Sequence, residues 1–188
     1  MYKICKANAE DISTVFDFTN NLVQHHEGMT EFFLMSQESM LEAFNNNAFE
    51  CLILFDDESE TKKAVGYMLY MEEYSLLHGY GYYIDDFYVS PEIRGKGLGK
   101  LLMHHIFNIA SENKVQFLKL VFQKSILGLE KMYISFGFDN ISSPLSGVQM
   151  YEIFGRDEVN RMIQGVEIED ISEDRFHFYI KRRAKGIS

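Results

Sequence analysis

Cysteine, proline and tryptophan are scarce in this 188-residue chain, which contains two cysteines, two prolines and no tryptophan. Cys5 and Cys51 stand far apart in apolar, strand-like runs, and the sequence has no Cys-x-x-Cys pair or Cys/His cluster. This spacing argues against a disulfide framework and against a zinc site. It indicates reduced, buried thiols in a cytoplasmic protein, and we expect no metal.

Long apolar runs are also missing. No segment approaches the roughly 20 consecutive apolar residues of a membrane-spanning helix, and residues 1–11 lack the apolar core of a signal peptide. Hydrophobic residues nevertheless make up 46% of the chain, which is enough for the core of one globular domain. We therefore expect no membrane partner.

Positive charge is scarce in the first half of the chain. The formal net charge is −10, and residues 1–90 carry 4 basic side chains against 16 acidic ones. Residues 91–188 carry 14 basic and 12 acidic side chains. This balance argues against nonspecific nucleic-acid binding, which requires a basic surface. One half suits a cationic ligand and the other an anionic one, although a solvated acidic surface is the simpler explanation.

The hydrophobic pattern predicts a mixed α/β order of elements. Strands are expected at 2–6, 49–55, 64–71, 81–89, 115–122 and 149–154, and helices at 9–25, 36–44, 98–110 and 126–136. The near-continuous apolar run 115–122 is typical of a strand covered on both faces. No linker or repeat divides the chain, so we expect one α/β domain with an antiparallel start and a parallel later part.

The strongest chemical signal is the turn RGKGLGK at residues 94–100. Three glycines at alternate positions let backbone N–H groups point outward together, directly before the positive end of a helix dipole. Arg94, Lys96 and Lys100 add positive charge, so the turn is predicted to hold a phosphate or pyrophosphate. Leu101 and Leu102 exclude a Walker P-loop and a GxGxxG fingerprint, which need Ser or Thr and Gly at these positions.

This turn and the strand before it resemble the acetyl-CoA signature of GNAT-type N-acetyltransferases. The segment FYVSPEIRGKGLG (87–99) is similar to the family's apolar-x-Val strand end followed by x-Pro-x-x-Arg-Gly-x-Gly-x-Gly. The segment MYISFGF (132–138) resembles the end of the family's last conserved helix. Within the superfamily, YIDDFYV (83–89) and the region NLVQHHEG (21–28) are most similar to the diamine (spermidine/spermine) and thialysine acetyltransferases.

The resemblance implies a GNAT-like mixed sheet, with antiparallel N-terminal strands, splayed parallel central strands and helices on both faces. It covers residues 1–154, which we expect to form the acetyltransferase domain. Residues 155–188 are expected to be an extension packed on this domain or continuing it. We also expect a homodimer.

The resemblance further implies that acetyl-CoA is the cosubstrate and lies in the gap between the splayed strands. The strand backbone is expected to pair with the pantetheine arm, and the turn to hold the pyrophosphate. A backbone N–H near Phe87 is the candidate donor to the thioester carbonyl. The expected cofactor-binding residues are Phe87, Tyr88, Val89, Arg94, Gly95, Lys96, Gly97, Leu98, Gly99 and Lys100.

Direct attack by an amine requires two proton transfers. An alkylammonium group, with a pKa of about 10.4, must lose a proton, and the departing thiolate must gain one. Asp85 is the candidate base, with Asp86 behind it, and Tyr133 is the candidate acid. Because adjacent strand side chains point to opposite faces, we expect only one of the two aspartates to line a given pocket. Alternatively, the two aspartates are solvated or structural acids at the end of a strand, and Tyr133 is a core residue.

Glu27 and Glu31 lie between the first two predicted helices, where the resembling group binds amines. With Asp85 and Asp86, they are the candidate substrate-binding residues, forming an acidic mouth for a small polyamine-like or lysine-like cation. Ordinary surface positions remain the alternative for these acids.

The sequence therefore predicts an acetyl-CoA-dependent N-acetyltransferase of small cationic amines, and three other functions stay open. A CoA-binding module without turnover is suggested by Asp85 and Ile126, which stand where the resembling group has a glutamate and an asparagine. A protein or peptide N-acetyltransferase would need an open groove instead of a closed acidic pocket. A nucleotide-binding regulator would use only the phosphate-binding turn.

Overall fold

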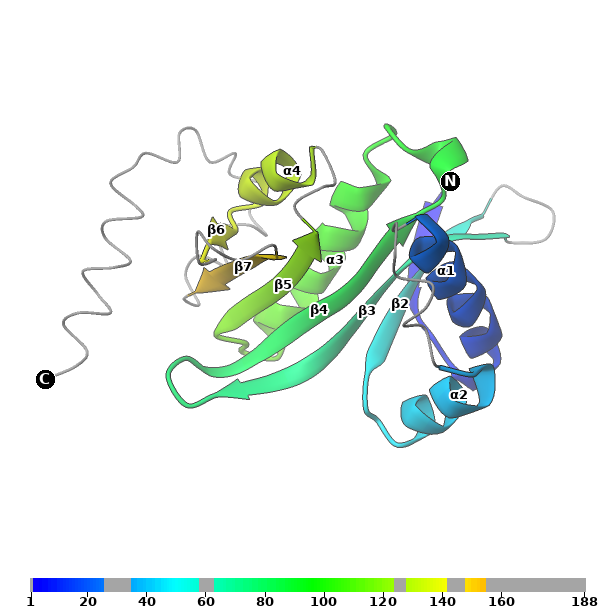
Figure 1. Cartoon of the computed structure of the whole chain (residues 1–188), viewed down its shortest axis with the longest axis horizontal. Helices are drawn as coiled ribbons and strands as arrows, with labels where there is room; N and C mark the ends of the chain where they lie inside the picture. The colour runs from blue at the N-terminus through cyan, green and yellow to red at the C-terminus, as the bar shows by residue number, and fades with distance from the viewer. Residues whose placement is uncertain (1, 26–34, 58–62, 124–127, 142–147, 155–188) are drawn as a thin grey trace, which may run out of the picture.

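The computed structural model describes residues 2–25, 35–57, 63–123, 128–141 and 148–154 (Figure 1). The elements in chain order are β1 (Tyr2–Lys6), a 3-10 turn (Ala9–Asp11), α1 (Ile12–His25), α2 (Gln37–Asn45), β2 (Glu50–Asp56), β3 (Lys63–Ser75), β4 (Gly79–Val89), a second 3-10 turn (Pro91–Ile93), α3 (Leu98–Glu112), β5 (Phe117–Gln123), α4 (Leu129–Ser135), β6 (Asp139–Asn140) and β7 (Val148–Phe154). Each strand and helix expected from the pattern is present within these residues. The expected extension 155–188 lies outside them.

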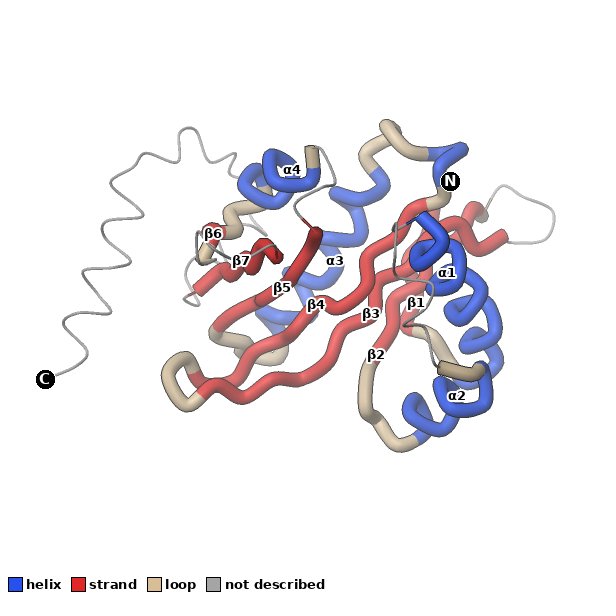
Figure 2. The backbone as a smooth tube through the Cα atoms, in the orientation of Figure 1, coloured by secondary structure: helices blue, strands red, loops and turns tan. Residues whose placement is uncertain are grey.

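The described strands form one mixed sheet in the order β1-β2-β3-β4-β5-β7-β6 (Figure 2). β1 to β4 pair antiparallel, and β4 pairs parallel with β5. These observations confirm the predicted fold class. The predicted parallel later part is wrong beyond this central pair, because β7 pairs antiparallel with both β5 and β6.

β4 and β5 separate part-way along their length. Their parallel pairing runs from Gly81 opposite Phe117 to Ile84 opposite Leu120, although β4 continues to Val89. On its other edge β4 stays paired with β3 as far as Val89. The last five residues of β4, 85–89, therefore have a described strand on one edge only, and Figure 1 shows the ends of β4 and β5 apart.

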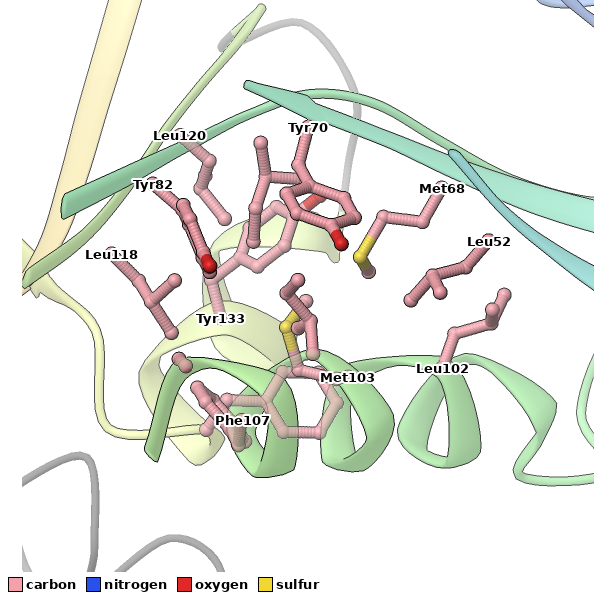
Figure 3. Packing of buried hydrophobic residues seen from close by; sticks show 14 of the residues in the cluster. Leu52, Met68, Tyr70, Tyr82, Leu102, Met103, Phe107, Leu118, Leu120 and Tyr133 are labelled. Atoms are coloured by element: carbon pink, nitrogen blue, oxygen red, sulfur yellow. The ribbon is translucent and has the colours of Figure 1, made fainter. Parts of the chain in front are cut away.

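Two helical layers cover the sheet. On the face covered by α3 and α4, here called the α3 face, the helices pack against the sheet through a core that includes Met103, Phe107 and Tyr133 (Figure 3). On the opposite face, here called the α1 face, α1 and α2 pack against the sheet through residues such as Val15 and Met40. The central strands are thus buried on both faces, as the apolar run 115–122 indicated.

Local signals position several element ends. Ser36 caps α2, with its side-chain oxygen accepting a 3.2 Å hydrogen bond from the Ser39 N–H. The helix ends in the asparagine run 45–47, where Asn47 adopts a φ of 56°. Of the two free cysteines, Cys51 is buried, but Cys5 is only partly buried.

None of the described helices is long and apolar enough to cross a membrane. Within the same residues, no group of three or more His, Cys, Asp or Glu side chains is arranged to hold a metal ion.

Candidate active site

The predicted phosphate-binding turn connects the end of β4 to α3. Gly95 and Gly97 have φ angles of +80° and +79°, which glycine adopts readily and other residues do not. A Cβ placed on either glycine would meet no atom within 4 Å. Gly97 is the N-cap residue of α3, and no side-chain hydrogen bond caps this helix end. The turn therefore leaves room for an anion at the positive end of the α3 dipole.

The three basic residues of the turn have different surroundings. Lys96 and Lys100 are exposed beside the helix N-terminus. The Arg94 Nε donates a 2.8 Å hydrogen bond to the Val89 carbonyl, and its guanidinium lies 5.7 Å from the centroid of the Tyr88 ring. Arg94 thus connects the turn to the end of β4 through these contacts, in addition to supplying positive charge.

Gly99 brings the first turn of α3 close to β4. A Cβ at this position would lie only 3.2 Å from the Phe87 ring, so glycine allows the ring to pack against the helix. Phe87 and Val89 pack on the α3 face, whereas Tyr88 is buried on the α1 face. The strand residues expected to bind the cofactor therefore present side chains to both faces. The feature that they can offer together to one ligand is the β4 backbone.

These features fit a cosubstrate that contains a pyrophosphate and an extended arm. The glycine turn and uncapped helix end suit the pyrophosphate, and Lys96 and Lys100 add the charge that it needs. Residues 85–89 begin a few residues before the turn, and their edge that no described strand covers suits hydrogen bonding to the arm.

β4 has a bulge at Asp85. On β3, Leu69 lies opposite Asp86, and the next residue, Tyr70, lies opposite Ile84. Asp85 is therefore an extra residue that pairs with no residue of β3. It is also the first β4 residue after the pairing with β5 has ended.

The bulge places both aspartates on the α1 face. Ile84 and Phe87, three residues apart, both pack on the α3 face, so the two residues between them share the opposite face. Asp86 bonds to α1 there, and Asp85 shares a hydrogen bond with Tyr83. The expectation that Asp85 and Asp86 point to opposite faces is wrong, because an inserted residue interrupts the alternation of side chains.

Asp86 belongs to a hydrogen-bond network that ties α1 to the sheet. Its Oδ2 accepts a 2.7 Å hydrogen bond from the Tyr67 hydroxyl on β3 and a longer one, 3.5 Å, from Thr19 on α1. The hydroxyls of Thr19 and Tyr67 lie 2.9 Å apart. Burial and then the charge of Asp86 raise the pKa of Tyr67, so Tyr67 remains a donor.

Asp85 is less constrained and more accessible than Asp86. It is an exposed residue, but partial burial of its carboxyl group raises its pKa, while the hydrogen bond with Tyr83 opposes this shift. Burial and then the charge of Asp85 raise the pKa of Tyr83 to about 12. A carboxylate with a raised pKa is a better proton acceptor, which is the property expected of the base.

Tyr133 lies on the other side of the sheet. It projects from α4 into the α3-face core, near Tyr82 and Leu120 (Figure 3). Its ring centroid is 5.2 Å from that of Phe122, which lies in the part of β5 beyond the pairing with β4. Burial raises the pKa of Tyr133, so its hydroxyl keeps its proton. Asp85 and Tyr133 thus lie on opposite faces of the sheet, beside the point where β4 and β5 separate.

The sequence reasoning missed Lys119 of β5. Its Nζ forms an ion pair with the Glu73 carboxylate on β3 and lies 5.4 Å from the centroid of the Tyr83 ring. The signal was present in the sequence, since Lys119 is the one charged residue in the apolar run 115–122. The candidate residues Glu27, Glu31 and Ile126 lie outside the described part of the chain.

Comparison with known proteins identifies the family of the chain. Residues 17–138 match the model of the acetyltransferase (GNAT) family. A thialysine N-ε-acetyltransferase from Bos taurus is 27% identical over 123 residues, which are 62% of this chain and 72% of the bovine protein. A protein of the same name from Mus musculus is 28% identical over 114 residues, 57% of this chain and 66% of the mouse protein.

Solved structures show the same fold at low identity. An N-acetyltransferase from Thermoplasma acidophilum in complex with coenzyme A is 17% identical, with a TM-score of 0.65 over 82% of this chain and 99% of that one. A putative acetyltransferase from Salmonella typhimurium with acetyl-CoA is also 17% identical, with a TM-score of 0.64 over 82% and 94% of the two chains. Because the family model matches well over half of the sequence, the chain belongs to the acetyltransferase (GNAT) family, and N-acetyl transfer is its class of activity.

Proposed function

We propose that the protein transfers an acetyl group from acetyl-CoA to the primary amine of a small cationic acceptor, either polyamine-like or lysine-like. The observation that carries this proposal is the position of Asp85 and Tyr133, on opposite faces of the sheet, beside the separation of β4 and β5. A proton acceptor and a proton donor then flank the place where the reacting atoms would meet.

The cosubstrate binds from the α3 face. Residues 94–100 hold its pyrophosphate through backbone N–H groups, and the edge of residues 85–89 that no described strand covers pairs with its pantetheine arm. Acetyl-CoA supplies an acetyl group activated as a thioester. The support for this cosubstrate is the glycine turn and the two similar structures that hold acetyl-CoA or coenzyme A.

The acceptor approaches from the α1 face. Three carboxylates lie on this side of the central strands, belonging to Glu73, Asp85 and Asp86. Glu73 is already paired with Lys119, so the negative charge of the two aspartates attracts a cationic amine and orients it toward the gap. The expected contributions of Glu27 and Glu31 remain predictions, as do the homodimer and the cytoplasmic location.

The chain's own groups carry the proton transfers. Asp85, directly or through one water, accepts the proton that the ammonium group loses. A β4 backbone N–H near Phe87 donates a hydrogen bond to the carbonyl oxygen as negative charge develops there. Tyr133 donates a proton to the departing sulfur. Most of the acceleration comes from holding the amine and thioester together in the right orientation.

The similar proteins support the lysine-like half of the acceptor class, since the bovine and mouse relatives are named for thialysine. The direct test is release of the CoA thiol from acetyl-CoA with spermidine, putrescine, thialysine, lysine, an aminoglycoside or a histone-tail peptide. We expect release with thialysine, lysine or the polyamines, weakening as ionic strength rises.

The other outcomes distinguish the remaining functions. Release with the peptide alone would indicate a peptide acetyltransferase. Thermal stabilisation by CoA without release would favour a CoA-binding module, and stabilisation by ATP in competition with CoA would favour a nucleotide-binding regulator. Failure of CoA to stabilise the protein would contradict the proposed cosubstrate.

A further inference from the structure

We propose that Lys119 determines the charge selectivity of the acceptor site, so that the enzyme prefers an amino-acid acceptor to a diamine of the same length. This inference rests on the proposed function and narrows its acceptor class. It starts from the contacts of the Lys119 ammonium, which lies on the α1 face of the central strands.

The Lys119 ammonium already occupies a cation-binding position. It pairs with the Glu73 carboxylate on one side and faces the Tyr83 ring on the other, 5.4 Å from the ring centroid. A carboxylate and an aromatic face are the two groups that bind alkylammonium ions in proteins. The side chains of Lys119 and Glu73 keep 21% and 30% of their surface exposed, so a ligand can reach them.

Lys119 lies on the acceptor side, one lysine length from the reaction centre. Leu118 and Leu120 pack on the α3 face, so Lys119 between them points to the α1 face. It pairs across the strands with Tyr83, two residues before Asp85 on β4. Two residues of strand span about 7 Å, a distance that an extended lysine side chain covers. An acceptor with its reacting amine at Asp85 therefore has its other end near Lys119.

The charge at that other end decides which acceptor binds well. Because Lys119 neutralises Glu73, a second, uncompensated ammonium group meets a like charge there and a carboxylate that is already paired. An amino acid carries a carboxylate beside its second ammonium, and Lys119 attracts that carboxylate. At such short range in a partly buried site, these interactions change affinity by about tenfold or more.

Lysine and 1,5-diaminopentane form a matched pair for the test, because they differ only in the α-carboxylate. We expect wild-type protein to have the higher kcat/KM with lysine. Lys119→Met should reduce the lysine-to-diamine ratio of kcat/KM by at least about tenfold, equal to 1.4 kcal/mol. Lys119→Arg retains the charge and should leave this ratio within about threefold of wild type.

A double variant tests the role of Glu73. Lys119→Met frees its carboxylate for the second ammonium of the diamine, so adding Glu73→Gln should abolish the gain with diaminopentane. Retained stabilisation by CoA shows that each variant is folded. If wild type acetylates both amines and Lys119→Met leaves their ratio unchanged, the role of Lys119 is overturned while the proposed function stands. If wild type acetylates no amine, the proposed function fails and this inference fails with it.

Discussion

The Tyr67 hydroxyl donates a 2.7 Å hydrogen bond to Asp86, directly beside the bulge at Asp85. The bulge turns two successive carboxylates to the same face of the sheet, and the hydrogen bond distinguishes them. Asp86 is committed to holding α1 on β3 and β4, whereas Asp85 remains accessible at the point where β4 leaves β5. The two aspartates therefore suit different roles, Asp86 in positioning and Asp85 in the proton transfer that we propose.

Replacing Tyr67 with Phe should impair both stability and acceptor binding. The variant leaves the Asp86 carboxylate without the hydrogen bond from the Tyr67 hydroxyl, at a cost of about 1.5–3 kcal/mol in the free energy of unfolding. Because the bulge is then less well held, KM for the amine should rise severalfold while affinity for CoA is kept.

Tyr70→Phe is the matched control for Tyr67→Phe. The Tyr70 hydroxyl donates an equally short bond, 2.7 Å, to Glu50 on the α3 face. Its loss should lower stability comparably without raising the amine KM. Denaturant unfolding and steady-state kinetics measure both effects, and equal changes in KM for the two variants would contradict the positioning role of Tyr67.

Asp85→Asn should reduce activity and preserve or increase stability. Loss of the base should lower kcat/KM for the amine by about 10²-fold. Burial raises the pKa of Asp85 in the folded protein above its unfolded value of about 3.9, so the folded state binds this proton more tightly. Stability from this group is present at low pH and is lost as pH rises through the folded-state pKa.

The pH dependence provides the check on Asp85. Above that pKa, Asp85→Asn should have a Tm at least equal to that of wild type. In wild type the rate should fall as acid protonates Asp85, and the variant should lack this step. Asp57→Asn, the same change at an exposed position at the end of β2, should alter neither activity nor its pH profile. Full activity in Asp85→Asn would exclude Asp85 as the base.

Tyr133→Phe should lower kcat by about 10²-fold if the hydroxyl protonates the departing sulfur. The change conserves core volume, so the variant should remain folded and keep its affinity for CoA. Because burial raises the pKa of Tyr133, its ionisation should cause no loss of kcat below about pH 10, the ordinary tyrosine pKa.

Tyr82→Phe is the control for Tyr133→Phe. Tyr82 is buried in the same core, but its hydroxyl accepts a 2.7 Å hydrogen bond from Asn113 at the end of α3. The Tyr82 variant should lose stability without a comparable loss of kcat. A normal kcat in Tyr133→Phe would exclude Tyr133 as the acid and show that it is only a core residue.

Gly97→Ala should weaken cofactor binding. Alanine is strained at a φ of +79° by roughly 1–2 kcal/mol, and its Cβ would enter the space in which the pyrophosphate is held. We expect the Kd for CoA to rise at least about tenfold.

Gly79→Ala controls for backbone strain in the Gly97 experiment. Gly79 has a similar φ of +85° but lies at the far end of β4, where the added Cβ meets only the exposed Gln116 side chain. This variant should lose stability and keep its affinity for CoA. Calorimetric titration with CoA measures the affinity of both variants, and equal affinities would argue against the glycine turn as the pyrophosphate site.

Local sequence signals were sufficient for much of this fold. The hydrophobic patterns of residues 2–6 and 36–44 and the glycine turn each act over a few residues, and each predicted the element that the structure shows. β3 continues to Ser75, beyond its predicted end at Met71, because it forms a long hairpin with β4 whose outer residues need not be apolar.

The register and the partners of paired strands could not be predicted from local sequence in the same way. A bulge is a difference in register between two strands, and nothing in the segment YIDDFYV specifies which residue of β3 will lie opposite Asp86. The ion pair of Lys119 and Glu73 likewise joins positions 46 residues apart in the chain. The candidate acid and base were therefore predictable as residue types, whereas their faces and partners required the structure.

The most direct test of the central claim is to measure both products of one incubation with acetyl-CoA and thialysine. The account predicts one N-acetylated thialysine for each free CoA formed by wild type. Asp85→Asn and Tyr133→Phe should both form the two products slowly, and both should still bind CoA. Detection of CoA binding with no acetylated product from thialysine, lysine or any polyamine would contradict it.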